Sequence, residues 1–174
     1  MLIRILNKLL NFLSVLPDKV RYVFYVKCCD NYDVFSTKFF KGVGTKVYGK
    51  GTFVVGDNSY CGERCGFQLE ASKGIFIGKN TSISHNVRVY TSNQNPVDII
   101  NENVSVNITS GDVYIGNNCW IGANVFIREG VNIGNFVVVG ANSVVTKDLP
   151  SNSIAAGAPI KILKQKENVQ RELN

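Results

Sequence analysis

The sequence predicts an all-β solenoid, in which short strands and tight turns wind around a narrow apolar core. Three observations lead to this prediction: an unbroken six-residue period in the C-terminal half, a looser copy of that period before it, and a composition of sixteen glycines but only four prolines in 174 residues. Such a composition is typical of a chain with many tight turns, and not of collagen or disorder. Apolar side chains make up 45% of the chain, which is enough for a continuous core.

The six-residue period is clearest between residues 115 and 149. The first position of each repeat is a β-branched aliphatic residue: Ile115, Ile121, Ile127, Ile133, Val139 and Val145. Four residues later comes a small or apolar residue: Cys119, Val125, Val131, Val137, Ser143 and Leu149. A helix would require spacings of three and four, and a simple strand would alternate strictly. The period instead predicts one short strand and one Gly or Asn turn per repeat, with coils of about three repeats stacked about 4.8 Å apart.

Two shorter runs in a similar register precede this region, one at Val55, Cys61 and Phe67 and the other at Ile77, Ile83 and Val89. The step from Val89 to Ile115 is not a multiple of six, so we expect a loop over about 91–111 to leave the column. Loops that interrupt a rigid repeat often carry functional residues. This Asn- and Ser-rich loop is therefore a candidate part of a binding site.

Residues 1–16 have leucines and isoleucines at helical spacing, with polar residues opposite, and predict an amphipathic helix that ends near Pro17. A second helical stretch is expected over about 18–29. The first segment is too short and too polar to span a bilayer, and no small-residue cleavage site follows it. We therefore expect a protein without a signal peptide, located in the cytoplasm.

Three parts are expected: an amphipathic helical segment over residues 1–38, the solenoid over 39–160, and a short C-terminal helix or tail over 161–174. The net charge of +6 lies wholly in the first fifty residues, because the rest holds ten basic and ten acidic side chains. A nucleic-acid binder with a basic stripe along its body is thereby disfavoured. Contact of residues 1–29 with the inner face of an anionic membrane stays open, as does capping of the solenoid's end.

The five cysteines are odd in number and form no CxxC pair, which is typical of small buried thiols in a reducing compartment. His85 is the single histidine, so a zinc site that requires three histidines is excluded. A carbonic anhydrase of this architecture is excluded for the same reason. The sequence thus predicts no metal cofactor.

The stretch from Ile115 to Ile162 resembles the coenzyme-A-binding half of bacterial hexapeptide-repeat acetyltransferases, and most of all the galactoside, maltose and polysaccharide O-acetyltransferases. The resemblance implies a left-handed parallel β-helix, a homotrimer, and acetyl-CoA bound between neighbouring subunits. The hand rests on the resemblance alone, since the general crossover rule would predict a right-handed coil.

The resemblance also assigns coenzyme contacts. Trp120, in NCWIGA, matches a residue at the pantetheine and acceptor end, where the alternative is a lone packed aromatic. Ala123 and Ala141 match positions whose backbone contacts the coenzyme arm. Four residues match positions at the adenosine and phosphate end of coenzyme A: Thr146, Lys147, Lys164 and, as a nearby substitute, Lys161. The alternative for the lysines is that they belong to a solvated tail. Cations at this end would suit the phosphates of coenzyme A.

Acetyl transfer requires a base that removes the acceptor's proton. In sugar acetyltransferases that base is a histidine before a proline, but here Asn95 precedes Pro96, and an amide cannot act as a base. His85 is the third residue of its repeat, a register that resembles serine acetyltransferases and amino-sugar N-acetyltransferases. We expect His85 to be the general base and Asn95 to be a substrate-positioning or vestigial residue. The alternative for His85 is an exposed turn histidine.

The expected function is acetyl-CoA-dependent O-acetylation of a sugar in capsule, lipopolysaccharide or other surface polysaccharide synthesis. The acceptor could be lipid-linked or nucleotide-linked. Two alternatives stay open: N-acetylation of a nucleotide-linked amino sugar, which the register of His85 favours, and a catalytically silent β-helix scaffold, which Asn95 favours.

Overall fold

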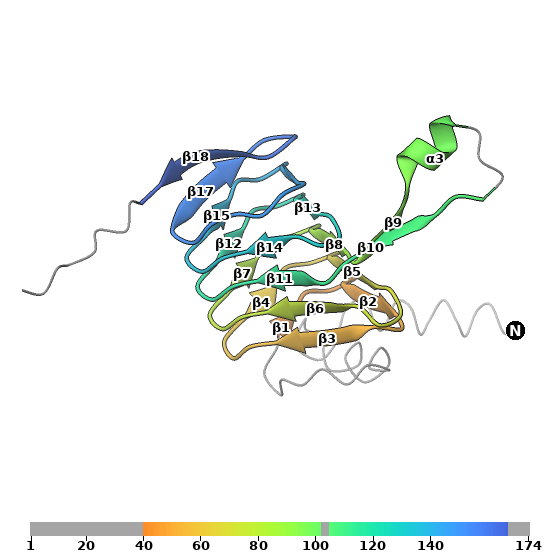
Figure 1. Ribbon diagram of the computed structural model, residues 1–174. Coiled ribbons are helices and arrows are strands. Elements are labelled where there is room, and N and C mark those ends of the chain that lie inside the picture. The colour runs from red at the N-terminus through yellow and green to blue at the C-terminus, as the bar shows by residue number, and fades with distance from the viewer. Residues whose placement is uncertain (1–39, 102–104, 167–174) are drawn as a thin grey trace, which may run out of the picture. The chain divides into compact units, whose positions relative to one another are not determined.

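The computed structural model describes residues 40–101 and 105–166, most of which form three sheets of short strands that are parallel except for the last strand of sheet A (Figure 1). Sheet A contains β1 (Phe40–Lys41), β4 (Tyr60–Cys61), β7 (Ser82–Ile83), β12 (Trp120–Ile121), β15 (Val138–Val139), β17 (Ser153–Ala156) and β18 (Lys161–Gln165). Sheet B contains β2 (Lys46–Gly49), β5 (Gly66–Leu69), β8 (Arg88–Tyr90), β13 (Phe126–Ile127) and β16 (Val144–Val145). Sheet C contains β3 (Thr52–Val55), β6 (Gly74–Ile77), β11 (Val113–Ile115) and β14 (Asn132–Ile133).

The chain visits the sheets in the cyclic order B, C, A, so each strand pairs with the strand one coil before and one coil after it. Ile133 pairs with Ile115, eighteen residues earlier, as three six-residue repeats per coil require. The turns between the sheets stack into three corners, named here the A–B, B–C and C–A corners.

The predicted core register is confirmed. The first residues of the repeats point inward, and none of the six from Ile115 to Val145 exposes more than 2% of its surface. The residues four positions later are buried as well, including the thiol of Cys119 and the hydroxyl of Ser143. Cys61, Cys65 and Cys119 are free, buried cysteines. One apolar cluster of stacked aliphatic side chains thus runs through all the described coils.

Glycine and asparagine have separate tasks in the turns. Where successive inward side chains are six residues apart, the residue three positions after the first has a positive φ, and this residue is usually asparagine, as at Asn118 (55°) and Asn124 (58°). Asparagine tolerates the left-handed conformation better than most residues. Position 116, directly after an inward side chain, requires glycine for a different reason. A Cβ there would lie 2.5 Å from the carbonyl oxygen of Gly134 in the next coil.

Differences in coil length are confined to the B–C corner. Across the A–B corner the inward residues are always six apart, as between Cys61 and Phe67 or between Ile83 and Val89. Across the B–C corner the same step is ten residues from Phe67 to Ile77. It is 26 residues in the following coil, where the loop predicted at about 91–111 lies.

That coil carries an excursion, residues 92–110, named here the arm. The chain leaves the column after Thr91 and returns at Gly111, whose N–H donates to the Thr91 carbonyl at 2.9 Å. The arm contains β9 (Ser92–Gln94), the short helix α3 (Pro96–Ile100) and β10 (Ile108–Ser110), and β9 pairs antiparallel with β10. Figure 1 shows the arm projecting away from the sheets.

The C-terminal prediction was wrong for residues 161–165, which form neither a helix nor a free tail. They form β18, which turns back and pairs antiparallel with β17. The physical reason is that β17 would otherwise leave its backbone donors and acceptors unpaired at the edge of sheet A. The helices expected over residues 1–38 lie outside the described residues. No helix in the described part of the chain is long and apolar enough to cross a bilayer.

Candidate active site

Three of the predicted site residues lie in one row at the A–B corner. The third positions of successive repeats stack there, in the order Val43, Glu63, His85, Ala123 and Ala141. Backbone hydrogen bonds fix this order: Asn86 N–H donates to the Glu63 carbonyl at 2.8 Å, Asn124 N–H to the His85 carbonyl at 3.0 Å, and Asn142 N–H to the Ala123 carbonyl at 2.8 Å. His85 and Ala141 are therefore two coil steps apart, or about 10 Å.

The exposed ring of His85 is held by the coil before it. The Glu63 backbone N–H donates to His85 Nδ1 at 3.1 Å, and a Cβ on Gly62 would lie 2.9 Å from the same atom. Because Nδ1 accepts, the neutral ring carries its proton on Nε2. Within the described residues no carboxylate is hydrogen-bonded to the ring. Asparagines make the same ladder contact at the C–A corner, where Lys79 N–H donates to Asn117 Oδ1 at 2.8 Å.

Asn95 lies on the arm, which leaves the column at the B–C corner. It is the N-cap of α3, and its Oδ1 accepts a hydrogen bond from Val97 N–H at 3.1 Å. Its own N–H donates to the Asn107 carbonyl at 2.8 Å. Within one chain, His85 and Asn95 therefore belong to elements that start from different corners.

The predicted coenzyme residues fall into two groups. Trp120, 57% exposed, stands on the outward face of sheet A. The same row continues through Val138 and Ile154 to Lys164, and Lys161 also lies on β18. Thr146 and Lys147 follow β16 and so lie at the B–C corner, across sheet B from Ala123 and Ala141. One chain thus brings Trp120, Lys161, Lys164 and the two alanines to sheet A and its corner with sheet B, but not Thr146 or Lys147.

Glu129 is a functional candidate that the sequence analysis missed. It is buried at the B–C corner, where Asn93 and Arg128 donate to its carboxylate and Thr109 Oγ1 donates at 3.2 Å. Burial would raise the pKa of this carboxyl group, but the hydrogen bonds from Arg128 and Asn93 outweigh it and lower the pKa. Glu129 therefore joins both strands of the arm to the column. Its signal in the sequence was weak: it is the single acid at a third position from Ile115 onward.

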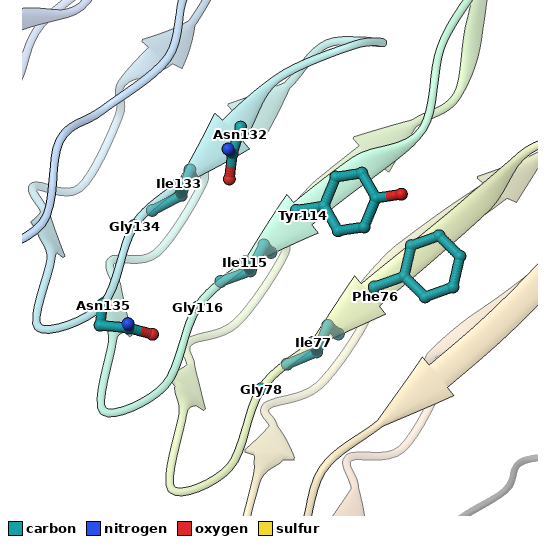
Figure 2. Close-up of a pocket in the computed structure, with 10 residues that line it drawn as sticks. All are labelled: Phe76, Ile77, Gly78, Tyr114, Ile115, Gly116, Asn132, Ile133, Gly134 and Asn135. Carbon is teal, nitrogen blue, oxygen red and sulfur yellow. The ribbon is translucent and has the colours of Figure 1, made fainter.

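A shallow groove of about 340 Å³ lies on sheet C (Figure 2). The rings of Phe76 and Tyr114 stack there, with centroids 4.8 Å apart, and Asn132 lies on the strand beside Tyr114. No predicted site residue lines this groove. Within the described residues, no three His, Cys, Asp or Glu side chains form a group that could hold a metal ion.

Comparisons with known proteins agree with this architecture. The family model for bacterial transferase hexapeptides (six repeats) matches residues 112–147. WbbJ of Escherichia coli, assigned as a lipopolysaccharide biosynthesis O-acetyl transferase, is 34% identical over 140 residues, which cover 75% of this chain and 70% of WbbJ. The chain spans about two thirds of the length of the curated relatives that it matches first.

Two solved structures are similar. A maltose O-acetyltransferase from Clostridium difficile is 29% identical, with a TM-score of 0.64, over 85% of this chain and 88% of that one. A galactoside acetyltransferase in complex with coenzyme A is 29% identical, with a TM-score of 0.57, over 73% of this chain and 65% of that one. From the similarity to WbbJ and the six-residue coils, the chain belongs to the hexapeptide-repeat acetyltransferase family.

Proposed function

We propose that this protein is an acetyl-CoA-dependent O-acetyltransferase that acts on a sugar in the synthesis of a surface polysaccharide. The observation that carries the proposal is the row at the A–B corner, where His85 is followed by Ala123 and Ala141 on the next two coils. A row of small residues lets the thin coenzyme arm approach the backbone, with its thioester end at His85. The relative WbbJ, assigned to lipopolysaccharide biosynthesis, and the coenzyme bound to the galactoside enzyme support this reading.

We further propose a left-handed coil and a homotrimer with acetyl-CoA between subunits. In Figure 1 the near strands of sheet C run from right to left while the chain climbs, which supports the left hand. In a single chain, Ala141 and Lys147 lie at opposite ends of sheet B. A site between subunits would let one coenzyme contact the A–B corner of one subunit and the B–C corner of its neighbour.

In this reaction the acceptor hydroxyl attacks the thioester carbonyl carbon, a C–O bond forms, and the C–S bond breaks. The hydroxyl proton passes to a base and the thiolate of coenzyme A leaves. His85 is the proposed base. Its Nε2 carries the proton while Nδ1 accepts from Glu63, so in this state it can donate to the developing oxyanion. To act as a base, the ring must first release the Glu63 amide. We propose that Asn95, on the arm, positions the acceptor.

The variant His85→Asn tests this assignment. Asparagine makes the same ladder contact elsewhere in the column, so the fold should persist while the imidazole is lost. Thiol release from acetyl-CoA, measured with a panel of sugars, should fall by about 10²–10⁴-fold, the usual cost of losing a general base. Binding of acetyl-CoA, measured by calorimetry, should be unchanged.

Asn135→Ser is the matched control. Ser151 already makes the ladder contact one coil above Asn135, so serine suits this position, and activity should stay at the wild-type level. Activity of His85→Asn within a few-fold of wild type would remove His85 from the reaction. A protein that binds no acetyl-CoA would instead be a silent scaffold.

A second candidate is N-acetylation of a nucleotide-linked amino sugar, favoured by the position of His85 on a coil and not on the arm. The same panel distinguishes the two, because an amino-sugar nucleotide would then release thiol faster than any sugar hydroxyl. Contact of residues 1–29 with the inner face of a membrane stays a prediction, since these residues lie outside the described part of the chain.

A further inference from the structure

A cationic cleft of about 640 Å³ opens on sheet B, on the coils before and at His85. Three basic side chains line it, Lys46, Arg64 and Arg88, together with Tyr48 and Cys65 and two glycines. Lys46 and Arg88 stand in one row across three paired strands, with Gly66 between them. The missing side chain at Gly66 makes the floor of the cleft.

The two glycines provide the space in which the arginines lie. A Cβ on Gly66 would lie 2.9 Å from Arg88 Cδ, so the stem of Arg88 rests directly on Gly66. A Cβ on Gly44 would likewise lie 3.4 Å from Arg64 Cγ. Two arginines on successive coils are therefore each seated over a glycine of the coil before.

The guanidinium of Arg88 is held in place by backbone. It donates to the Arg64 carbonyl and, at 3.3 Å, to the Val87 carbonyl. Both contacts use one terminal nitrogen, which leaves the other N–H groups of the guanidinium for a ligand. Within the described residues no carboxylate forms an ion pair with Lys46, Arg64 or Arg88; the ion pairs found there are Lys79–Asp57 and Arg128–Glu129.

Tyr48 adds a neutral hydroxyl group to this charged surface, with its O–H hydrogen-bonded to Tyr90. Burial and its hydrogen bond with Tyr90 raise the pKa of Tyr48 to about 12, so its hydroxyl stays protonated at neutral pH. The cleft therefore presents positive charge and neutral hydrogen-bonding groups. This chemistry matches a phosphate or carboxylate attached to a polar ring.

The cleft adjoins the row of site residues. Arg64 is the turn residue that follows Glu63, and the Glu63 amide is the group that holds His85 Nδ1. Arg88 lies three residues after His85, on the next strand of the same coil. Along the A–B corner the order is thus Ala141, Ala123, His85 and then Arg64, which puts the cleft on the side of His85 away from the proposed coenzyme positions.

We propose that this cleft holds an anionic group, a phosphate or a carboxylate, on the acceptor sugar, and so selects charged over neutral acceptors. The proposal rests on the proposed function. The size supports it, because 640 Å³ is within the range of small-molecule sites and suits a monosaccharide with one charged substituent.

Calorimetry on the full-length protein at low salt tests the cleft without requiring turnover. The probes are glucose 1-phosphate, glucuronate, glucose and inorganic phosphate. Both charged sugars, or the one whose anion the cleft prefers, should bind at least about tenfold more tightly than glucose, since charge-assisted hydrogen bonds are the stronger kind. Competition by inorganic phosphate would identify phosphate as the preferred anion, and preference for glucuronate would identify carboxylate. The affinity should fall as salt is added.

The variants Lys46→Gln and Arg64→Gln should each weaken binding of the charged sugar by about tenfold. These variants are preferred to Arg88→Gln, which also removes hydrogen bonds to two backbone carbonyls. Lys79→Gln is the matched control, because it removes the same charge from an exposed lysine that is paired with Asp57 at 3.8 Å, outside the cleft. Equal binding of glucose, or an equal loss in Lys79→Gln, would overturn the proposal.

The thiol-release assay separates this proposal from the proposed function. If neutral sugars are acetylated and the cleft variants keep the wild-type KM, the cleft is not an acceptor site, although the enzyme is an acetyltransferase. If the charged sugars bind in the cleft but no acceptor releases thiol, the anion site stands and the proposed function fails.

Discussion

At the residue scale, the buried carboxylate of Glu129 is the contact on which the arm depends. It accepts from Asn93 on β9 and from Thr109 on β10, and it pairs with Arg128 on the column. Hydrophobic periodicity could not reveal it, because it is the partner of polar side chains twenty and thirty-six residues away. His85 illustrates the same limit, since its bond to Glu63 depends on a coil of 22 residues that the sequence does not make evident.

Glu129 should make the stability of the fold depend on pH at pH values below the ordinary pKa of a glutamate side chain. Its folded-state pKa is lowered, so its contribution is complete above the unfolded-state pKa, about 4.5, and is lost as the pH falls through the lowered pKa. Thermal unfolding followed by circular dichroism should therefore give a wild-type Tm that drops below about pH 4.5. Glu129→Gln should flatten this dependence and cost about 1–3 kcal/mol at pH 7, since Arg128 loses its charged partner. Equal pH profiles for the two proteins would contradict the role.

At the scale of elements, the column and the arm follow different rules. The strands of the column were predictable because each repeat buries one aliphatic side chain at a fixed interval. The arm was predictable as an interruption of the repeat, but not as a helix between paired strands. The helix α3 buries no apolar side chain among its described residues and is fixed by the Asn95 cap, so it leaves no hydrophobic pattern in the sequence. Strand β18 was missed since all five of its residues are exposed and only backbone pairing fixes it.

Removal of the arm should leave the column intact. Deletion of the arm together with Thr91, the column residue before it, brings Val89 and Ile115 to a spacing of six, the step found elsewhere at this corner between Ile127 and Ile133. We expect a cooperative unfolding transition close to that of wild type, and unchanged acetyl-CoA binding. Sugar acetylation should be lost if Asn95 positions the acceptor. Full activity of the shortened chain would show that the arm makes no contact with the acceptor.

At the scale of the whole molecule, the separation of Ala141 from Lys147 is the observation that a trimer would explain. A flat solenoid face also offers the surface that a symmetric assembly needs. Light scattering should give a mass about three times the 19.2 kDa of the chain. A monomer at micromolar concentration would contradict the shared site.

Mixed trimers provide a sharper test of that site. Suppose that each site takes His85 from one subunit and Lys147 from another. Trimers of the His85→Asn variant and trimers of the Lys147→Glu variant should then each be inactive. An equal mixture of the two should regain about a quarter of wild-type activity, because random assembly completes about one site in four. Unfolding and refolding the mixture provides the exchange, and refolded wild type is the control. Mixtures that stay as inactive as the separate variants would place both residues in one subunit's site, and full activity of either variant alone would remove its residue from the site.

The confinement of all coil-length differences to the B–C corner has a consequence for how this architecture can change. The A–B corner keeps its six-residue step from Cys61 to Val145, so His85, Ala123 and Ala141 hold their spacing whatever is inserted opposite. A longer loop adds only a slowly growing entropic cost, and it disturbs no aliphatic ladder. New acceptor preferences can therefore arise by replacing one surface segment, while the residues that we propose face the thioester keep their positions. Exchanging the arm between family members is, on this basis, the most economical way to redirect the enzyme.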